Sequence, residues 1–125
     1  MNMWGIILVV VIVFGITMIG CGFLFEKHTP KRINFILGYR SFRSMKSKEA
    51  WEYGNKLSGL LLSRLGIALF ICSIAALIFV HGNSDIMIRN VGIAIIVVHA
   101  LLIIISALAT ELALHKHFDK NGNRL

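Results

Sequence analysis

Three long apolar runs constrain the fold of this 125-residue chain more than any other feature. Residues 3–25 contain no charged residue, 57–80 contain only Arg64, and 91–114 contain only Glu111. A bilayer core about 30 Å thick needs roughly 20 apolar residues in a helix. Helices suit such runs because they satisfy their own backbone hydrogen bonds in lipid. The sequence therefore predicts an all-α, single-domain membrane bundle of three transmembrane helices.

The expected spans are residues 3–25, 57–80 and about 88–114. A motif segment, 26–56, joins the first two, an outside loop, 81–87, joins the last two, and a tail, 115–125, follows. The first run is too long for a removable signal peptide, and no Lys or Arg precedes it.

Basic residues are distributed unevenly and predict the orientation. Of thirteen Lys and Arg residues, eight lie within 26–56 and three within the tail. Because cytoplasmic segments carry the excess of Lys and Arg, we expect a multi-pass membrane protein with its N-terminus outside and its C-terminus in the cytoplasm. The net charge of +7 is then explained by topology and by attraction to membrane lipids rather than by direct nucleic-acid binding.

The 26–56 segment is longer than a plain connection between two helices needs. Before Ser44 it mixes aromatic, aliphatic and polar residues without a clear period, which suits a segment lying among lipid headgroups. Ser47 is placed to cap a helix with Glu49 in its first turn. We expect this helix to continue unbroken into the second span, with Trp51 and Tyr53 at the membrane interface.

Within this segment the residues resemble a known family. Asn34-x3-Gly38-Tyr39-Arg40-Ser41 is followed by Ser44-Met45-Lys46-Ser47, by Glu49-Ala50-Trp51 and by Asn55. This order is similar to the signature of the SdpI-type immunity protein family, over roughly residues 34–66. The family often has Thr where this chain has Ser41, and its longest members carry an additional N-terminal membrane half, so we expect a short form.

The resemblance implies a non-catalytic integral protein of the bacterial plasma membrane. Such a protein would protect a Gram-positive cell from a secreted, membrane-active peptide toxin, which is a bacteriocin immunity function. It also implies a signalling receptor that holds a cytoplasmic transcriptional repressor at the membrane. It implies no cofactor, and the sequence suggests no metal site.

The motif supplies the candidate binding residues. Gly38 suits a tight turn, Tyr39 an interfacial anchor with its hydroxyl toward water, and Arg40 a fork to a carboxylate or lipid phosphate. Two interpretations stay open: the polar groups satisfy one another, or they contact a ligand directly. The candidates are Asn34, Gly38, Tyr39, Arg40, Ser44, Met45, Trp51 and Asn55.

Arg64, His99 and Glu111 lie within the apolar runs, and ionisable residues in a membrane span usually face the bundle interior. We expect Arg64 to pair with Glu111, the alternative being that Arg64 extends to the headgroups. His99 is expected to hydrogen-bond to a neighbouring helix. Stripes of small residues predict close helix packing and allow a homodimer.

Two alternative functions fit the same hydropathy. A holin-like permeabilising protein can have three spans and a basic tail, although it would not need the patterned insert. A small multidrug transporter subunit would be expected to carry an acidic residue in its first span, which this chain lacks. The sequence contains neither an HExxH motif nor a phosphate-binding glycine loop, so no common catalytic motif indicates an enzyme.

Overall fold

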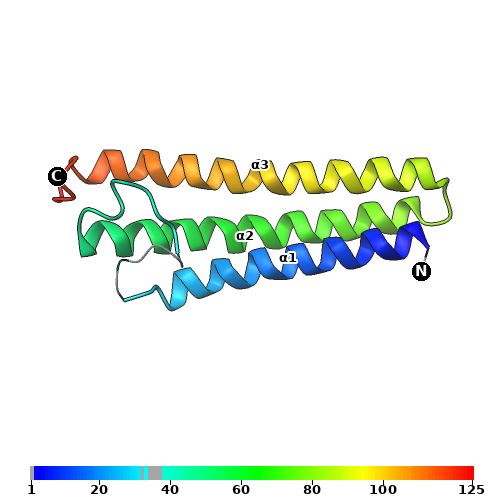
Figure 1. Ribbon diagram of the computed structural model, residues 1–125, viewed down its shortest axis with the longest axis horizontal. Coiled ribbons are helices and arrows are strands. Elements are labelled where there is room, and N and C mark those ends of the chain that lie inside the picture. Colours follow the sequence, from blue (N-terminus) through cyan, green and yellow to red (C-terminus); the bar gives the residue numbers. More distant parts are fainter. Residues whose placement is uncertain (1, 32, 34–37) are drawn as a thin grey trace.

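The computed structural model describes residues 2–31, 33 and 38–125, so the candidate Asn34 lies outside the described residues. Its three helices are α1 (Met3–Lys27), α2 (Lys48–Val80) and α3 (Asp85–His117). Successive helices run antiparallel along the long axis, so α1 and α3 point the same way (Figure 1). The N-terminus lies beside the α2–α3 turn, whereas the C-terminus lies at the other end with the α1–α2 connection. All three are long and apolar enough to cross a membrane, which confirms the predicted three-helix, multi-pass bundle.

Local sequence explains where the helices begin. The Ser47 hydroxyl accepts a hydrogen bond from the Ala50 N–H at 3.0 Å, and Ser84 accepts one from the Met87 N–H at 3.3 Å. Acidic Glu49 and Asp85 lie in the first turns, where the helix dipole favours negative charge. The prediction that one unbroken helix runs from Ser47 into the second span is confirmed. Because α2 and α3 have 33 residues each, or about 50 Å, both extend beyond the roughly 30 Å hydrocarbon core.

Helices α1 and α2 touch backbone to backbone near one end of the bundle. A Cβ added to Gly59 would lie 2.5 Å from the Gly22 carbonyl oxygen and 2.5 Å from the Glu26 nitrogen. A Cβ added to Gly22 would in turn meet the Ser63 nitrogen at 2.6 Å. The predicted small-residue contact therefore forms within one chain. It matters because association of helices in lipid depends on close van der Waals packing.

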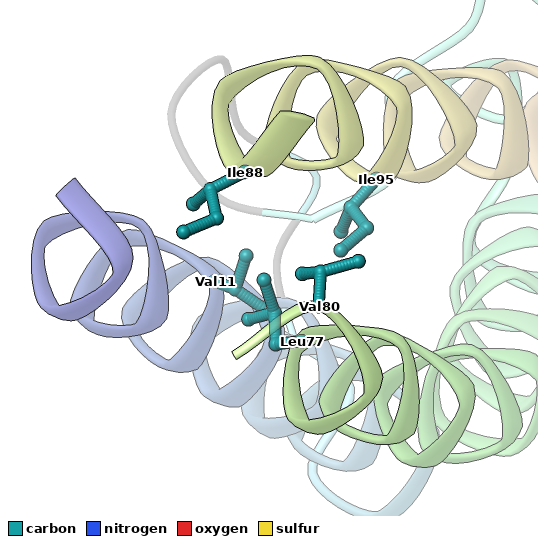
Figure 2. Close-up of a cluster of buried hydrophobic side chains, with 5 residues drawn as sticks. All are labelled: Val11, Leu77, Val80, Ile88 and Ile95. Atoms are coloured by element: carbon teal, nitrogen blue, oxygen red, sulfur yellow. The ribbon is translucent and has the colours of Figure 1, made fainter. Parts of the chain in front are cut away.

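The opposite end is closed by larger aliphatic side chains. Figure 2 shows side chains from all three helices converging there. The Trp4 Nε1–H also donates to the Leu77 carbonyl at 2.7 Å, which joins α1 to the last turns of α2. This packing fixes the N-terminal half of α1 against its partners. The buried cluster consists of Val11, Leu77, Val80, Ile88 and Ile95.

Between these ends the bundle places small polar side chains inside and large aliphatic ones outside. Ser73 and Thr110 are buried, and each donates to a carbonyl of its own helix, Leu69 and Ser106 respectively. Exposed aliphatic residues include Ile71, Ile104 and many others on all three helices. This inside-out distribution suits a chain surrounded by lipid, because lipid solvates the apolar surface that water would exclude.

Two expectations for the spans are wrong. Arg64 pairs with Glu26 of α1, with 3.1 Å between Nη2 and Oε1, and not with Glu111. The sequence placed Glu26 outside the first span, but α1 continues to Lys27 and brings this carboxylate beside α2. His99 is buried, but its Nδ1 pairs with the Ile95 carbonyl of its own helix at 2.8 Å instead of with a neighbour.

In the predicted small-residue stripe of α2, formed by Ala68, Cys72 and Ala76, Ala76 packs against the buried aliphatic cluster. Ala68 and Cys72 are both exposed on the outer surface of the bundle. The homodimer stays a prediction, and this outward pair is one surface that it could use.

Candidate functional site

The motif residues gather at the end of the bundle that holds the α1–α2 connection and the C-terminus (Figure 1). We call this region, residues 38–56 and 114–125, the cap. Its centre is Asn55, whose side chain is fully buried. The Asn55 Oδ1 accepts from the Tyr39 N–H at 2.7 Å, and Nδ2 donates to the Tyr39 carbonyl at 3.3 Å and to the Trp51 carbonyl at 2.9 Å. One amide therefore satisfies both backbone groups of Tyr39, as a neighbouring strand would.

Gly38 precedes Tyr39 because no other residue fits there. Its φ is +102°, a value that residues with a Cβ rarely adopt. An added Cβ would also lie 2.5 Å from the Asn55 Oδ1. The predicted tight turn is present, and it is what lets the Asn55 amide approach the backbone.

Tyr39 connects the loop to α3. Its hydroxyl donates to the Glu111 Oε1 at 2.7 Å and also lies 3.2 Å from the Ala107 carbonyl. Burial, followed by the hydrogen bond to the Glu111 carboxylate, raises the pKa of Tyr39 well above its ordinary value. The expectation that this hydroxyl faces water is therefore wrong. Tyr39 is instead a tie between the motif loop and the third helix.

Trp51 was expected at the membrane interface, but its side chain is fully buried in the cap. Its Nε1–H donates to the Pro30 carbonyl at 2.8 Å. The indole thereby holds the chain leaving α1 against the first turns of α2. A buried indole with a satisfied N–H contributes both packing area and a directional contact.

Ser41 and Ser44 close the second part of the loop on itself. The Ser41 N–H donates to the Ser44 Oγ at 2.8 Å, and the Ser44 N–H donates to the Ser41 Oγ at 3.1 Å. Ser44 is fully buried. These reciprocal bonds explain why short hydroxyl residues stand three apart in the motif.

The C-terminal tail completes the cap, a role that sequence reasoning missed. Phe118 is fully buried, and its carbonyl accepts from Arg43 Nη1 at 3.0 Å. The Gly122 carbonyl accepts from the Ser47 Oγ at 2.6 Å. The only available signal was one aromatic residue, Phe118, in an otherwise polar tail. In the tail turn, hydrogen bonds from Asn123 and Asn121 hold the pKa of Asp119 below its ordinary value.

The remaining motif residues line an open cleft on the surface of the cap. This basic cleft has a volume of about 730 Å³ and is lined in part by Arg40 and Met45. Phe42, which also lines the cleft, is 92% exposed. The motif thus divides into residues that build the cap from inside and residues that present a surface. The other ionisable residues around the cleft are Arg43, Lys46, Glu111, His115 and Lys120.

A second concavity lies in the membrane-spanning part of the bundle. This apolar groove, of about 540 Å³, is lined mainly by α1 residues such as Val13 and Phe14, together with Leu62 of α2 and Ile103 of α3. The Phe14 ring also packs edge-on against the buried His99 ring, with 5.5 Å between the ring centroids. Among the described residues, the His99 Nε2 has no hydrogen-bond partner.

In the comparison with known proteins, residues 31–110 match the SdpI/YfhL protein family. The chain belongs to the SdpI/YfhL family. The family match covers the motif, all of α2 and most of α3. The parts of the cap contributed by Phe118 and Gly122 lie outside it.

One curated relative within the SdpI/YfhL family is the uncharacterized protein YfhL of Bacillus subtilis (strain 168). It is 37% identical over 65 residues, which cover 46% of this chain and 59% of the relative. The alignment therefore spans less than two thirds of that protein. No solved structure matches the chain.

Proposed function

We propose that this chain is a membrane immunity protein, which protects its cell from a secreted, membrane-active peptide toxin without catalysing a reaction. The supporting observation is that the residues shared with SdpI-type proteins form a folded cap. Gly38, Tyr39, Trp51 and Asn55 are held by hydrogen bonds or close contacts inside it. Such an element suits a receptor whose shape must be kept, whereas simple membrane permeabilisation does not require it.

In this proposal the N-terminus and the 81–84 turn face outside, and the cap faces the cytoplasm. The concentration of Lys and Arg at the cap end supports this orientation. A toxin that inserts from outside would meet the membrane-spanning surface before it could reach the cap. The apolar groove beside Phe14 and Ile103 has the character of a surface that accepts an amphipathic or apolar helix.

The resemblance to SdpI-type proteins also implies signalling through a cytoplasmic transcriptional repressor. In that role the repressor would contact the cap, which presents Arg40, Lys46 and Lys120 on the proposed cytoplasmic side. The Tyr39–Glu111 bond links that surface to α3, whose Ile103 lines the groove. Toxin-dependent recovery of a DNA-binding protein in the membrane fraction would test this part separately.

The direct test is expression in a toxin-sensitive Gram-positive host, with survival measured against toxin concentration. The proposal expects wild-type protein to raise the inhibitory concentration severalfold and Ile103→Trp, which fills the groove, to abolish the increase. Ile71→Trp is the matched control, because Ile71 is 63% exposed on α2 and does not line the groove. Unchanged survival despite correct membrane insertion would refute immunity, and killing of the host would favour the holin-like alternative.

A further inference from the structure

We propose that the basic cleft is a binding site for the phosphate of an anionic phospholipid. This inference goes beyond the immunity proposal and does not depend on it. Four cationic side chains line the cleft, namely Arg40, Arg43, Lys46 and Lys120. They come from the motif loop and from the tail, which the Arg43–Phe118 and Ser47–Gly122 hydrogen bonds hold together.

Among the described residues that line the cleft, the single carboxylate, Glu111, does not cancel this charge. Glu111 accepts a hydrogen bond from the Tyr39 hydroxyl at 2.7 Å. It also lies 3.5 Å from the His115 Nε2. The carboxylate is thus engaged by protein groups, while four cationic side chains are present along the described lining. The local field favours an anionic ligand.

Arginine geometry indicates phosphate as that anion. Arg43 is positioned by one hydrogen bond, from Nη1 to the Phe118 carbonyl at 3.0 Å. A guanidinium has five N–H donors in a planar fork, so this bond orients the group and leaves donors for oxygen atoms of a ligand. Forks of this kind match the oxygen spacing of phosphate.

The position of the cleft favours a lipid over a soluble anion. On α3, Leu108 and Leu112 are 60% and 72% exposed, which marks the outward apolar surface. Glu111 and His115 line the cleft on the same stretch of helix, where this apolar surface ends. Phe42, 92% exposed, stands at the cleft and offers a side chain for acyl contact. A headgroup phosphate in the cleft would thus have its chains beside apolar protein surface.

The experiment measures lipid binding to the full chain in an uncharged detergent by native mass spectrometry. Phosphatidylglycerol and phosphatidylcholine are titrated separately, and inorganic phosphate is added as a competitor. We expect the Arg40→Gln/Lys46→Gln variant to bind phosphatidylglycerol roughly 10- to 30-fold more weakly, because each cation near an anionic lipid contributes substantially to affinity. Both residues are exposed, so helical content by circular dichroism should not change. If this variant aggregates, Lys120→Glu replaces it in the same titration.

The matched control is Lys31→Gln/Lys56→Gln, which removes the same charge from exposed positions at the same end but outside the basic cleft. Its affinity should stay within about threefold of the wild-type value. Equal weakening in both variants would overturn the site in favour of general surface charge. Equal binding of the two lipids, or displacement by millimolar inorganic phosphate, would overturn lipid specificity. Displacement by a short oligonucleotide at comparable concentration would overturn the lipid assignment in favour of nucleic acid.

Discussion

Replacing Asn55 with alanine should open the cap without unfolding the bundle. The substitution removes the partner of the Tyr39 N–H and of the Tyr39 carbonyl, which Asn55 binds at 2.7 Å and 3.3 Å. An unsatisfied buried polar group costs about 1–3 kcal/mol. Tyr39 is only partly buried, so each of its two backbone groups should cost an amount near the lower end of this range. We therefore expect the closed loop to lose about 2–3 kcal/mol of stability in total. A difference of 1.4 kcal/mol is tenfold in an equilibrium constant, so local opening should rise roughly 30- to 150-fold.

Hydrogen exchange of the backbone amides, followed by mass spectrometry in detergent or nanodiscs, measures this opening directly. Peptides covering residues 38–47 should exchange faster in Asn55→Ala by about that factor, while peptides from the middle of α1 should not change. Asn83→Ala is the matched control. Asn83 is exposed at the other end of the bundle, where it donates one 3.3 Å bond to the Val80 carbonyl. An increase of less than about threefold in Asn55→Ala would refute the reasoning that this amide holds the loop.

Three further predictions concern the bundle and the tyrosine. Gly59→Ala should destabilise the protein by about 1–3 kcal/mol in thermal unfolding, since its Cβ would overlap α1 backbone. Gly20→Ala, which would meet nothing within 4 Å, should be close to neutral. The pKa of Tyr39 is raised in the folded state, so its protonated form contributes stability below about pH 10 that is lost as pH rises further. Ultraviolet titration should show one of the two tyrosines ionising at higher pH than the other. Tyr39→Phe should remove the transition at higher pH. Ionisation of both tyrosines at the same pH would contradict this prediction. A double-mutant cycle on Glu26 and Arg64, which are 3.1 Å apart, should give a coupling of about 0.5–1 kcal/mol in unfolding, and zero coupling would argue against the pair.

Several features of the cap could be predicted from sequence because they depend on neighbours along the chain. Ser47 as a helix cap, and a turn at Gly38, follow from local backbone chemistry. Asn55, a candidate from the motif, binds the loop backbone at Tyr39. The interpretation that the motif's polar groups satisfy one another is confirmed for Asn55, Trp51 and Tyr39, whereas direct ligand contact by a residue such as Arg40 stays a prediction.

Other contacts could not be predicted because they join residues far apart in the chain. The partner of Arg64 depended on α1 continuing as far as Lys27, and helix ends are poorly defined by hydropathy. The burial of Trp51 depended on the path of the chain after α1, which brings the Pro30 carbonyl to the indole. The tail contacts of Phe118 span 75 residues from Arg43, and no periodicity encodes such a pairing.

The sequence by itself determined that this chain forms three membrane-spanning helices, because apolar length and backbone hydrogen bonding in lipid leave few other solutions. It also determined the family, through the order of the motif residues. Only the tertiary structure decided which polar groups meet. Tyr39 pairs with Glu111, and Arg64 pairs with Glu26, since these contacts depend on the relative depth and rotation of packed helices rather than on spacing along the chain. The same packing brought four cations from the loop and the tail around one cleft.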